Sequence, residues 1–237
     1  MRGFAIVLMV FYHFVWDLNF FGLYQGNVLG TAWQTFARSI ATTFLFVVGV
    51  SLTLSYNSYR QKKGQPPPFS KYLWRGGIVF GFGLFITVAT YFFIGRRGFV
   101  IFGILHLIGT AIILGYPFLR LSRWVSLVAG LAGIALGSYF SGLLVDYPWL
   151  IWLGIKQHGI FMVDYYPLLP WFAISLLGIF AGYSLYPNSI RAIELPNLSE
   201  VNWVRGLSFL GRHSLLIYLV HQPILIGLVF VATSLIN

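Results

Sequence analysis

Apolar stretches long enough to cross a lipid bilayer recur along almost the whole of this 237-residue chain. A transmembrane helix needs about 20 mainly apolar residues. Only 8% of the residues are charged, whereas a soluble domain carries about 25%. The sequence therefore predicts an all-α, polytopic transmembrane helix bundle of about seven spans, folded as a single domain over residues 1–237. The expected spans cover residues 4–23, 32–56, 72–94, 99–119, 125–144, 168–186 and about 206–237.

The segments between these spans carry most of the positive charge. The net charge is +10, and in a membrane protein this pattern reports topology and contact with anionic headgroups. No compact basic domain stands out in the sequence, so a nucleic-acid partner is not expected. With the N-terminus in the cytoplasm, the outer segments hold only Arg96, Arg97 and Lys156, so we predict a cytoplasmic N-terminus and an external C-terminus. The cytoplasmic segments then hold Arg2, Arg60, Lys62, Lys63, Lys71, Arg75, Arg120, Arg123, Arg191, Arg205 and Arg212.

Two local features predict how the segments pack. The connection over residues 146–166 is aromatic and mixed in charge, and Trp149 and Trp152 favour an interfacial helix at headgroup level. Three Gly-x-x-x-Gly spacings inside the expected spans favour close approach between helices. These spacings begin at Gly77, Gly133 and Gly178.

Two ionisable residues lie inside the first apolar stretch. His13 and Asp17 are four residues apart, so on a helix they share one face. An ionisable group in hydrocarbon costs roughly 3 kcal/mol or more, and such groups usually face the protein interior or a wet cavity. This pair therefore predicts a buried reaction or transport site.

Other polar residues are expected at a similar depth. At a rise of about 1.5 Å per residue, His13 lies about 16 Å beyond Arg2, and His221 lies about 13 Å beyond the start of the last span. His106 enters from the opposite side to a depth of about 10 Å, and Arg38 enters on the second span to a similar level. We expect Arg38, His106 and His221 to form a supporting polar layer around the first pair.

Each of these residues also has a purely structural interpretation. The histidines could be hydrogen-bond partners between helices, and Arg38 could extend to the outer headgroups. We predict that Arg38 instead lies close to Asp17 near the outer face, as the counter-charge of its carboxylate. No metal site is expected, because no two histidines on one helix have zinc-type spacing. Cysteine is absent from the sequence, which excludes thiolate nucleophiles and ligands.

One pattern in the first span is more specific: Arg2, ten residues, then His13. It resembles the arginine–histidine signature that opens the first span of the transmembrane acyltransferase superfamily. Within that superfamily, the chain resembles the bacterial branch of the heparan-alpha-glucosaminide N-acetyltransferase catalytic family. Four further stretches carry the resemblance in the expected order: residues 44–51, 102–109, 164–171 and 210–223.

This resemblance implies a multi-pass acyltransferase of the cell membrane, here the bacterial inner membrane. Such an enzyme takes acetyl-CoA or another acyl-CoA from the cytoplasm and passes the acyl group to an acceptor outside, usually a sugar. His13 would be the essential histidine, and Arg2 its partner near the CoA entrance. The expected partners are thus acyl-CoA, a carbohydrate acceptor and the lipid bilayer, and a homo-oligomer is compatible with the sequence.

The residues themselves favour the same geometry. Anionic CoA phosphates suit the basic cytoplasmic face, where Arg2, Arg75, Arg205 and Arg212 are the candidate binding residues. A neutral His13 could deprotonate the acceptor, with Asp17 orienting its ring. A covalent acyl-histidine intermediate is an open alternative. Two other functions also remain open: a proton-coupled transporter with the polar layer as relay, and a structural subunit held together by that layer.

Overall fold

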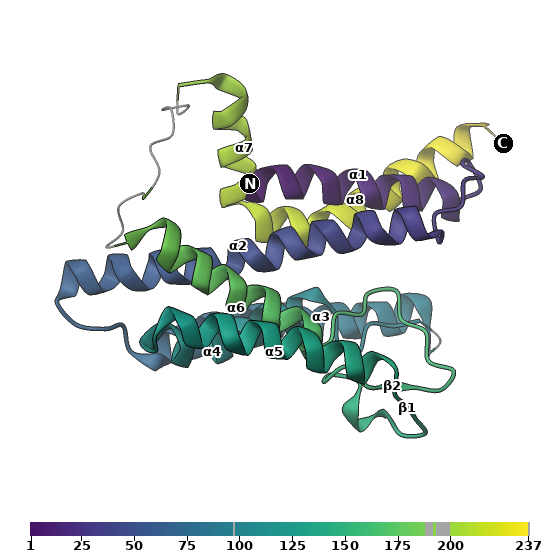
Figure 1. Ribbon diagram of the computed structural model, residues 1–237. Coiled ribbons are helices and arrows are strands. Elements are labelled where there is room, and N and C mark those ends of the chain that lie inside the picture. Colours follow the sequence, from purple (N-terminus) through teal and green to yellow (C-terminus); the bar gives the residue numbers. More distant parts are fainter. Residues whose placement is uncertain (97, 188–191, 193–199, 237) are drawn as a thin grey trace. The chain divides into compact units, whose positions relative to one another are not determined.

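The computed structural model describes residues 1–96, 98–187, 192 and 200–236, and most of them are helical (Figure 1). The contacts divide the chain into two compact units. The first consists of Met1–Phe44 and Leu195–Asn237, and the second of Leu45–Glu194. One long helix, α2 (Thr31–Lys63), contributes its beginning to the first unit and the rest to the second.

The first unit joins the start of the chain to its end. It contains α1 (Arg2–Phe20), the first part of α2, α7 (Asn202–Arg212) and α8 (Ser214–Ile236). Helix α1 runs alongside α8, and α7 packs against the amino end of α1 (Figure 1).

The interior of the first unit is apolar and aromatic. Ile6 and Met9 of α1 and Ile40 of α2 form its buried core. A Cβ atom at Gly3 would collide with the carbonyl oxygen of Leu207, so α7 approaches α1 where the side chain is smallest. Small residues permit this closeness between helices in the same way as in other membrane bundles.

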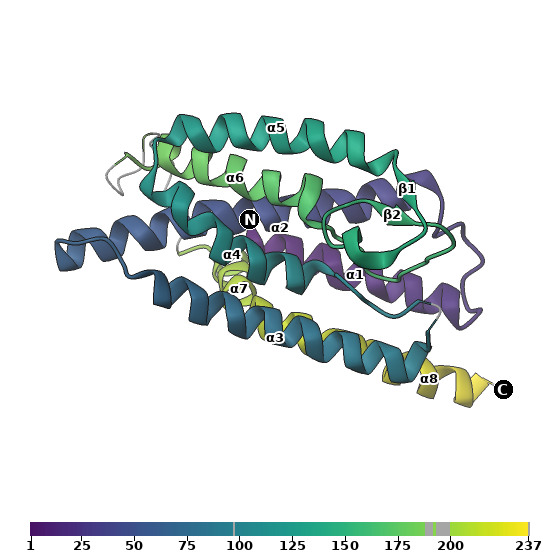
Figure 2. The ribbon, with the colours of Figure 1, turned by 90° about the horizontal axis from the view of Figure 1, so that it is seen from below.

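The second unit is built from two helix pairs. Helix α3 (Phe69–Ile94) packs on α4 (Ile104–Arg120), α5 (Arg123–Ser141) packs on α6 (Leu168–Leu185), and α4 also contacts α6 (Figure 2). Where α2 meets α6, the hydroxyl group of Ser175 donates a hydrogen bond to the carbonyl oxygen of Leu45, at 3.1 Å. Two short parallel strands, β1 (Leu144–Val145) and β2 (Lys156–Gln157), and the 3-10 helix η1 (Pro148–Leu150) lie between α5 and α6.

The predicted fold class is confirmed. Within the described ranges, six helices are long and apolar enough to cross a membrane: α1, α2, α3, α5, α6 and α8. Helix α4 is apolar but has only 17 residues. The last expected span is divided at His213 into α7 and α8. The direction in which the chain crosses the membrane stays a prediction, and two of the residues used for it, Arg97 and Arg191, lie outside the described residues.

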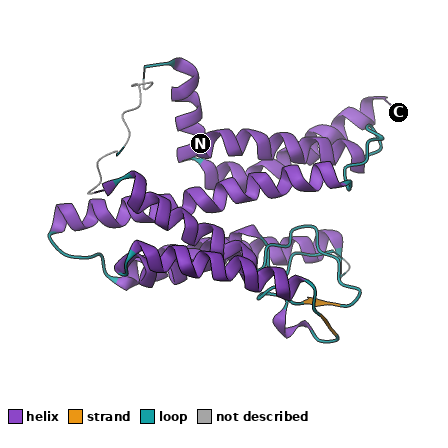
Figure 3. Ribbon diagram, in the orientation of Figure 1, coloured by secondary structure: helices purple, strands orange, loops and turns teal. Residues whose placement is uncertain are grey.

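Two expectations about packing need correction. The connection before α6 is not an interfacial helix but a set of turns around the two short strands (Figure 3). Gly154 and Gly159 both have positive φ angles there, at 126° and 71°, which interrupt a helix. The glycines of the motifs that begin at Gly133 and Gly178 lie against neighbouring helices, as expected. The motif that begins at Gly77 does not, because a Cβ at Gly77 would meet open space.

Candidate active site

Two histidines from opposite ends of the sequence meet in the first unit. The ring centroids of His13 on α1 and His221 on α8 lie 4.9 Å apart, and the rings meet nearly edge to face at 70°. The two rings are thus in contact, as expected if His221 belongs to a polar layer around His13, and the catalytic role of His13 stays a prediction.

Backbone hydrogen bonds determine which nitrogen of each ring carries the proton. His13 Nδ1 lies 2.9 Å from the carbonyl oxygen of Met9, and His221 Nδ1 lies 2.7 Å from that of Tyr218. A carbonyl oxygen only accepts, so Nδ1 must be the donor in both rings. In the neutral imidazole the other nitrogen, Nε2, is then unprotonated. Each ring thus presents Nε2 as a potential base.

The carboxylate of Asp17 has a different partner from the one expected. Gln222 Nε2 donates a hydrogen bond to Asp17 Oδ1 at 2.7 Å, whereas Arg38 is exposed on α2. The predicted pairing of Asp17 with Arg38 is wrong, because a neutral amide on α8 occupies the position expected for the cation. The predicted orientation of the His13 ring by Asp17 is also wrong. Asp17 Oδ1 accepts from Gln222 and Oδ2 has no partner, while the Met9 carbonyl oxygen holds Nδ1 of the ring.

Three polar atoms of this cluster are buried without a hydrogen-bond partner. They are Asp17 Oδ2, His221 Nε2 and Gln222 Oε1. Asp17 is only 1% exposed and His221 only 7%. More than about 90% of buried polar groups in proteins are hydrogen-bonded, and each unsatisfied group costs about 1–3 kcal/mol. Three such atoms lie close to His13 in the same cluster. A polar ligand bound there could form the hydrogen bonds that these atoms lack.

Basic side chains lie where α1 begins. A Cβ at Gly211 would lie 3.6 Å from the Cβ of Arg2, so Arg2 is beside the carboxyl end of α7. Arg205 and Arg212 are both exposed on α7. Three of the four residues expected to bind acyl-CoA therefore belong to the unit that contains His13, which follows Arg2 by about 16 Å along α1. The fourth, Arg75, is exposed on α3 in the second unit.

The comparison with known protein families decides the class of protein. Residues 1–223 match the model of the family described as heparan-alpha-glucosaminide N-acetyltransferase, catalytic. The chain belongs to this family. No curated protein and no solved structure matches the chain. The heparan-alpha-glucosaminide N-acetyltransferase family implies membrane acetyltransferase activity, and the matched range includes His13, Asp17, His221 and Gln222.

One residue assigned to the polar layer has a structural role in this family member. Helix α4 begins at Ile104 rather than at residue 99, so His106 lies in its first turn and not about 10 Å along the span. His106 Nδ1 accepts a hydrogen bond from the Gly103 N–H at 3.2 Å. Its Nε2 is then the donor to the hydroxyl oxygen of Thr87, at 3.3 Å. Both ring nitrogens are satisfied, as expected for a contact that holds α3 against α4.

Sequence reasoning missed an acidic residue at the same helix end. Asp164, in the connection before α6, accepts a hydrogen bond from the Ile104 N–H at 3.1 Å through Oδ2. A carboxylate is favourable at a helix amino end, where backbone N–H groups lack partners. Burial nevertheless raises the pKa of Asp164 to about 6, and the hydrogen bond from Ile104 opposes that rise. One signal could have drawn attention to it, because Asp164 opens one of the stretches that carry the resemblance to the acetyltransferase family.

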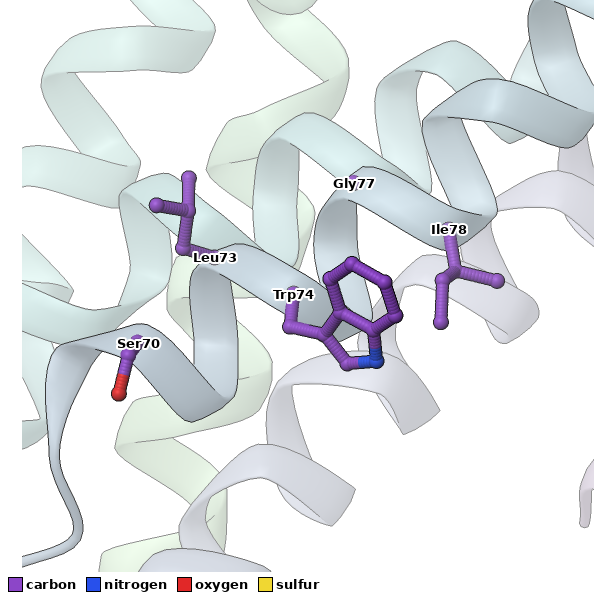
Figure 4. A pocket seen from close by; sticks show the side chains of 5 residues that line it. All are labelled: Ser70, Leu73, Trp74, Gly77 and Ile78. Atoms are coloured by element: carbon purple, nitrogen blue, oxygen red, sulfur yellow. The ribbon is translucent and has the colours of Figure 1, made fainter.

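A groove on α3 lacks the titratable side chains that a catalytic site needs. It encloses about 560 Å³ and is lined by a single helix, as the side chains in Figure 4 show. Its lining contains no titratable residue, and Trp74 and Leu73 give it an apolar wall. Among the residues that the structure describes, no group of three or more His, Cys, Asp or Glu could hold a metal ion. The cluster around His13 is therefore the candidate active site. The lining residues of the groove are Ser70, Leu73, Trp74, Gly77 and Ile78.

Proposed function

We propose that this protein transfers an acetyl group from acetyl-CoA, bound on the cytoplasmic side, to a sugar acceptor at the outer face of the membrane. The observation that carries the proposal is the His13–His221 pair, in which backbone carbonyls fix both Nδ1 protons and leave both Nε2 atoms as bases. Family membership supports acetyl transfer as the reaction.

His13 is the general base in this proposal. Its Nε2 takes the proton from the hydroxyl or amino group of the acceptor as that group attacks the thioester carbonyl carbon. The new bond to carbon forms, the carbon–sulfur bond breaks, and the thiolate of CoA takes the proton back from the imidazolium. The products are the acetylated acceptor and the free thiol of CoA, and no oxidant or reductant is consumed.

The positive charges near the start of α1 support the direction of transfer. The phosphates of CoA are anionic, and exposed guanidinium groups attract and bind phosphate. Arg2 lies beside α7, whose Arg205 and Arg212 side chains are exposed. The pantetheine arm then has about 16 Å to cover along α1 before the thioester reaches His13. The same route delivers the acetyl group into the membrane.

Vesicles test the reaction and its direction together. The purified protein is reconstituted with labelled acetyl-CoA on one side and D-glucosamine on the other, and the labelled product is identified by mass spectrometry. The proposal predicts product on the acceptor side, and only for molecules whose N-terminus faces acetyl-CoA. Proton-driven uptake of glucosamine without any acetyl transfer would overturn it in favour of a transporter.

A further inference from the structure

The contact between Asp17 and Gln222 uses only one oxygen of the carboxylate and only the amide nitrogen of the glutamine. One oxygen of Asp17 accepts from the Gln222 amide, while Asp17 Oδ2 and Gln222 Oε1 are buried without partners. His221 Nε2, whose ring donates through Nδ1 to Tyr218, is a third buried atom without a partner. All three are acceptors, and the other unpaired buried side-chain atoms among the described residues, the hydroxyl groups of Tyr72 and Ser126, belong to the second unit.

This imbalance determines the chemistry of a fitting ligand. A carboxylate, phosphate or ketone would add acceptors to acceptors and leave every buried atom unpaired. A molecule that carries neighbouring O–H or N–H groups would supply the donors that the three atoms lack. Vicinal hydroxyl groups on a sugar ring have this property.

The position of the cluster places such a molecule beside the base. Asp17 follows His13 by one turn of α1, a rise of about 6 Å. Gln222 directly follows His221, whose ring touches that of His13. A sugar held by these acceptors lies within reach of the His13 ring.

We propose that Asp17 and Gln222 position the acyl acceptor by accepting hydrogen bonds from two neighbouring hydroxyl groups of its ring. This inference rests on the proposed function. Asp17 orients the Gln222 amide through the bond to Nε2, so that Oε1 is left for the ligand. Both are positioning residues, because neither is assigned contact with the bond that forms or breaks.

One isosteric substitution separates this role from simple attachment of α1 to α8. In Asp17→Asn, the remaining carbonyl oxygen still accepts from Gln222, so the contact between the helices is kept. The other position changes from an acceptor to a donor, so the sugar hydroxyl can no longer donate a hydrogen bond to it. The acceptor KM should rise about tenfold or more, since a hydrogen bond to a charged group is lost. The acetyl-CoA KM should stay within about twofold, because the basic residues near Arg2 are unchanged.

A double variant restores the pattern of acceptors. Asp17→Asn combined with Gln222→Glu keeps one amide–carboxylate bond and again leaves two oxygens as unpaired acceptors. It should recover most of the acceptor KM that Asp17→Asn loses. Thr233→Val on α8 is the matched control, because the hydroxyl group of Thr233 bonds only to carbonyl oxygens of its own helix.

The experiment measures KM for glucosamine and for acetyl-CoA in wild-type protein and these variants. Binding of methyl α-D-glucopyranoside without acetyl-CoA is measured by calorimetry on the same samples. An analogue that lacks one of two vicinal hydroxyl groups should bind wild-type protein about tenfold more weakly, and this arm needs no variant to fold. An unchanged acceptor KM in Asp17→Asn, or equal binding of the deoxy analogues, would overturn the inference.

These outcomes distinguish the two proposals. If wild-type protein transfers acetyl groups while Asp17→Asn keeps its acceptor KM, the positioning role is wrong and the function stands. If wild-type protein binds the glucoside through Asp17 but transfers nothing, sugar binding by Asp17 and Gln222 stands, but the sugar is not an acyl acceptor and the proposed function is wrong. Absence of both binding and transfer contradicts both.

Discussion

Gln222 Nε2 lies 2.7 Å from Asp17 Oδ1, although 205 positions separate the two residues in the chain. The contact joins the first helix of the chain to the last one. It leaves the second carboxylate oxygen buried and unpaired, whereas an arginine partner would have satisfied both oxygens. With the neutral Gln222 as its partner, Asp17 keeps one oxygen available to accept a hydrogen bond from a ligand.

The orientation of the chain is the first prediction. The excess of Lys and Arg in alternate connections predicts a cytoplasmic N-terminus and an external C-terminus. Reporter fusions at residue 1 and residue 237 should report opposite sides of the membrane. Two reporters on the same side would contradict the seven-span count.

The second prediction concerns the approach of α7 to α1. In Gly3→Val the added carbons meet the backbone of Leu207, so α7 must move away from Arg2. We expect a lower melting temperature and a raised KM for acetyl-CoA. Gly206→Ala, where a Cβ meets open space on α7, is the control; it should leave the KM for acetyl-CoA unchanged and should not lower the melting temperature. If Gly3→Val and wild type have the same KM for acetyl-CoA, the position of α7 beside α1 does not matter for CoA binding.

The third prediction concerns acyl-CoA binding by charge. Arg212→Gln and Arg75→Gln should each raise the KM for acetyl-CoA several-fold, and added salt should narrow the difference from wild type, because exposed charges are screened. Lys156→Gln, on the segment predicted to face outside, is the control. Unchanged KM values in both arginine variants would place the CoA phosphates elsewhere while leaving the reaction class intact.

The fourth prediction is a pH dependence of stability in the second unit. Burial raises the pKa of Asp164 from 3.8 to about 6, so the folded protein holds this proton more tightly than the unfolded chain does. The contribution of Asp164 to stability is therefore greatest below about pH 4 and declines as the pH rises through about 6, by about 3 kcal/mol in all.

Melting curves between pH 4 and pH 7 check this sign. Asp164→Asn keeps an acceptor for the Ile104 N–H but cannot ionise, so its melting temperature should fall less than that of wild type over this range. Asp146→Asn, an exposed residue of the same connection, is the control. A steeper fall in Asp164→Asn than in wild type would reverse the argument.

Much of the fold followed from hydropathy, because a lipid bilayer requires long apolar helices wherever the chain crosses it. A helix occupies each of the seven expected places. The errors lie where hydropathy has no information. Helix α4 begins at Ile104 because Asp164 and His106 provide hydrogen bonds at that end, and one of these residues is 60 positions away. The connection before α6 is aromatic, but its glycines interrupt a helix.

The candidate site was predicted only in part, for a related reason. His13 and His221 could be placed together from the spacing along two helices, since both depths follow from the helical rise. Asp17 was assigned a cationic partner because charge is conspicuous in an apolar sequence, and that rule overlooked the neutral amide of Gln222. The Nδ1 contacts with Met9 and Tyr218 follow from helix geometry and were within reach of the sequence.

The central claim is that His13 is the general base, and turnover by His13 variants tests it most directly. Acetyl transfer to glucosamine is measured for His13→Ala and His13→Gln, with melting temperature and acetyl-CoA binding on the same samples and His158→Ala, an exposed histidine, as the control. A positioned base contributes about 10²–10⁴-fold, so both His13 variants should lose at least about a hundredfold in turnover while folding and acetyl-CoA binding are kept. If His13→Gln retains wild-type turnover while His13→Ala unfolds, His13 is a packing residue and the account is contradicted.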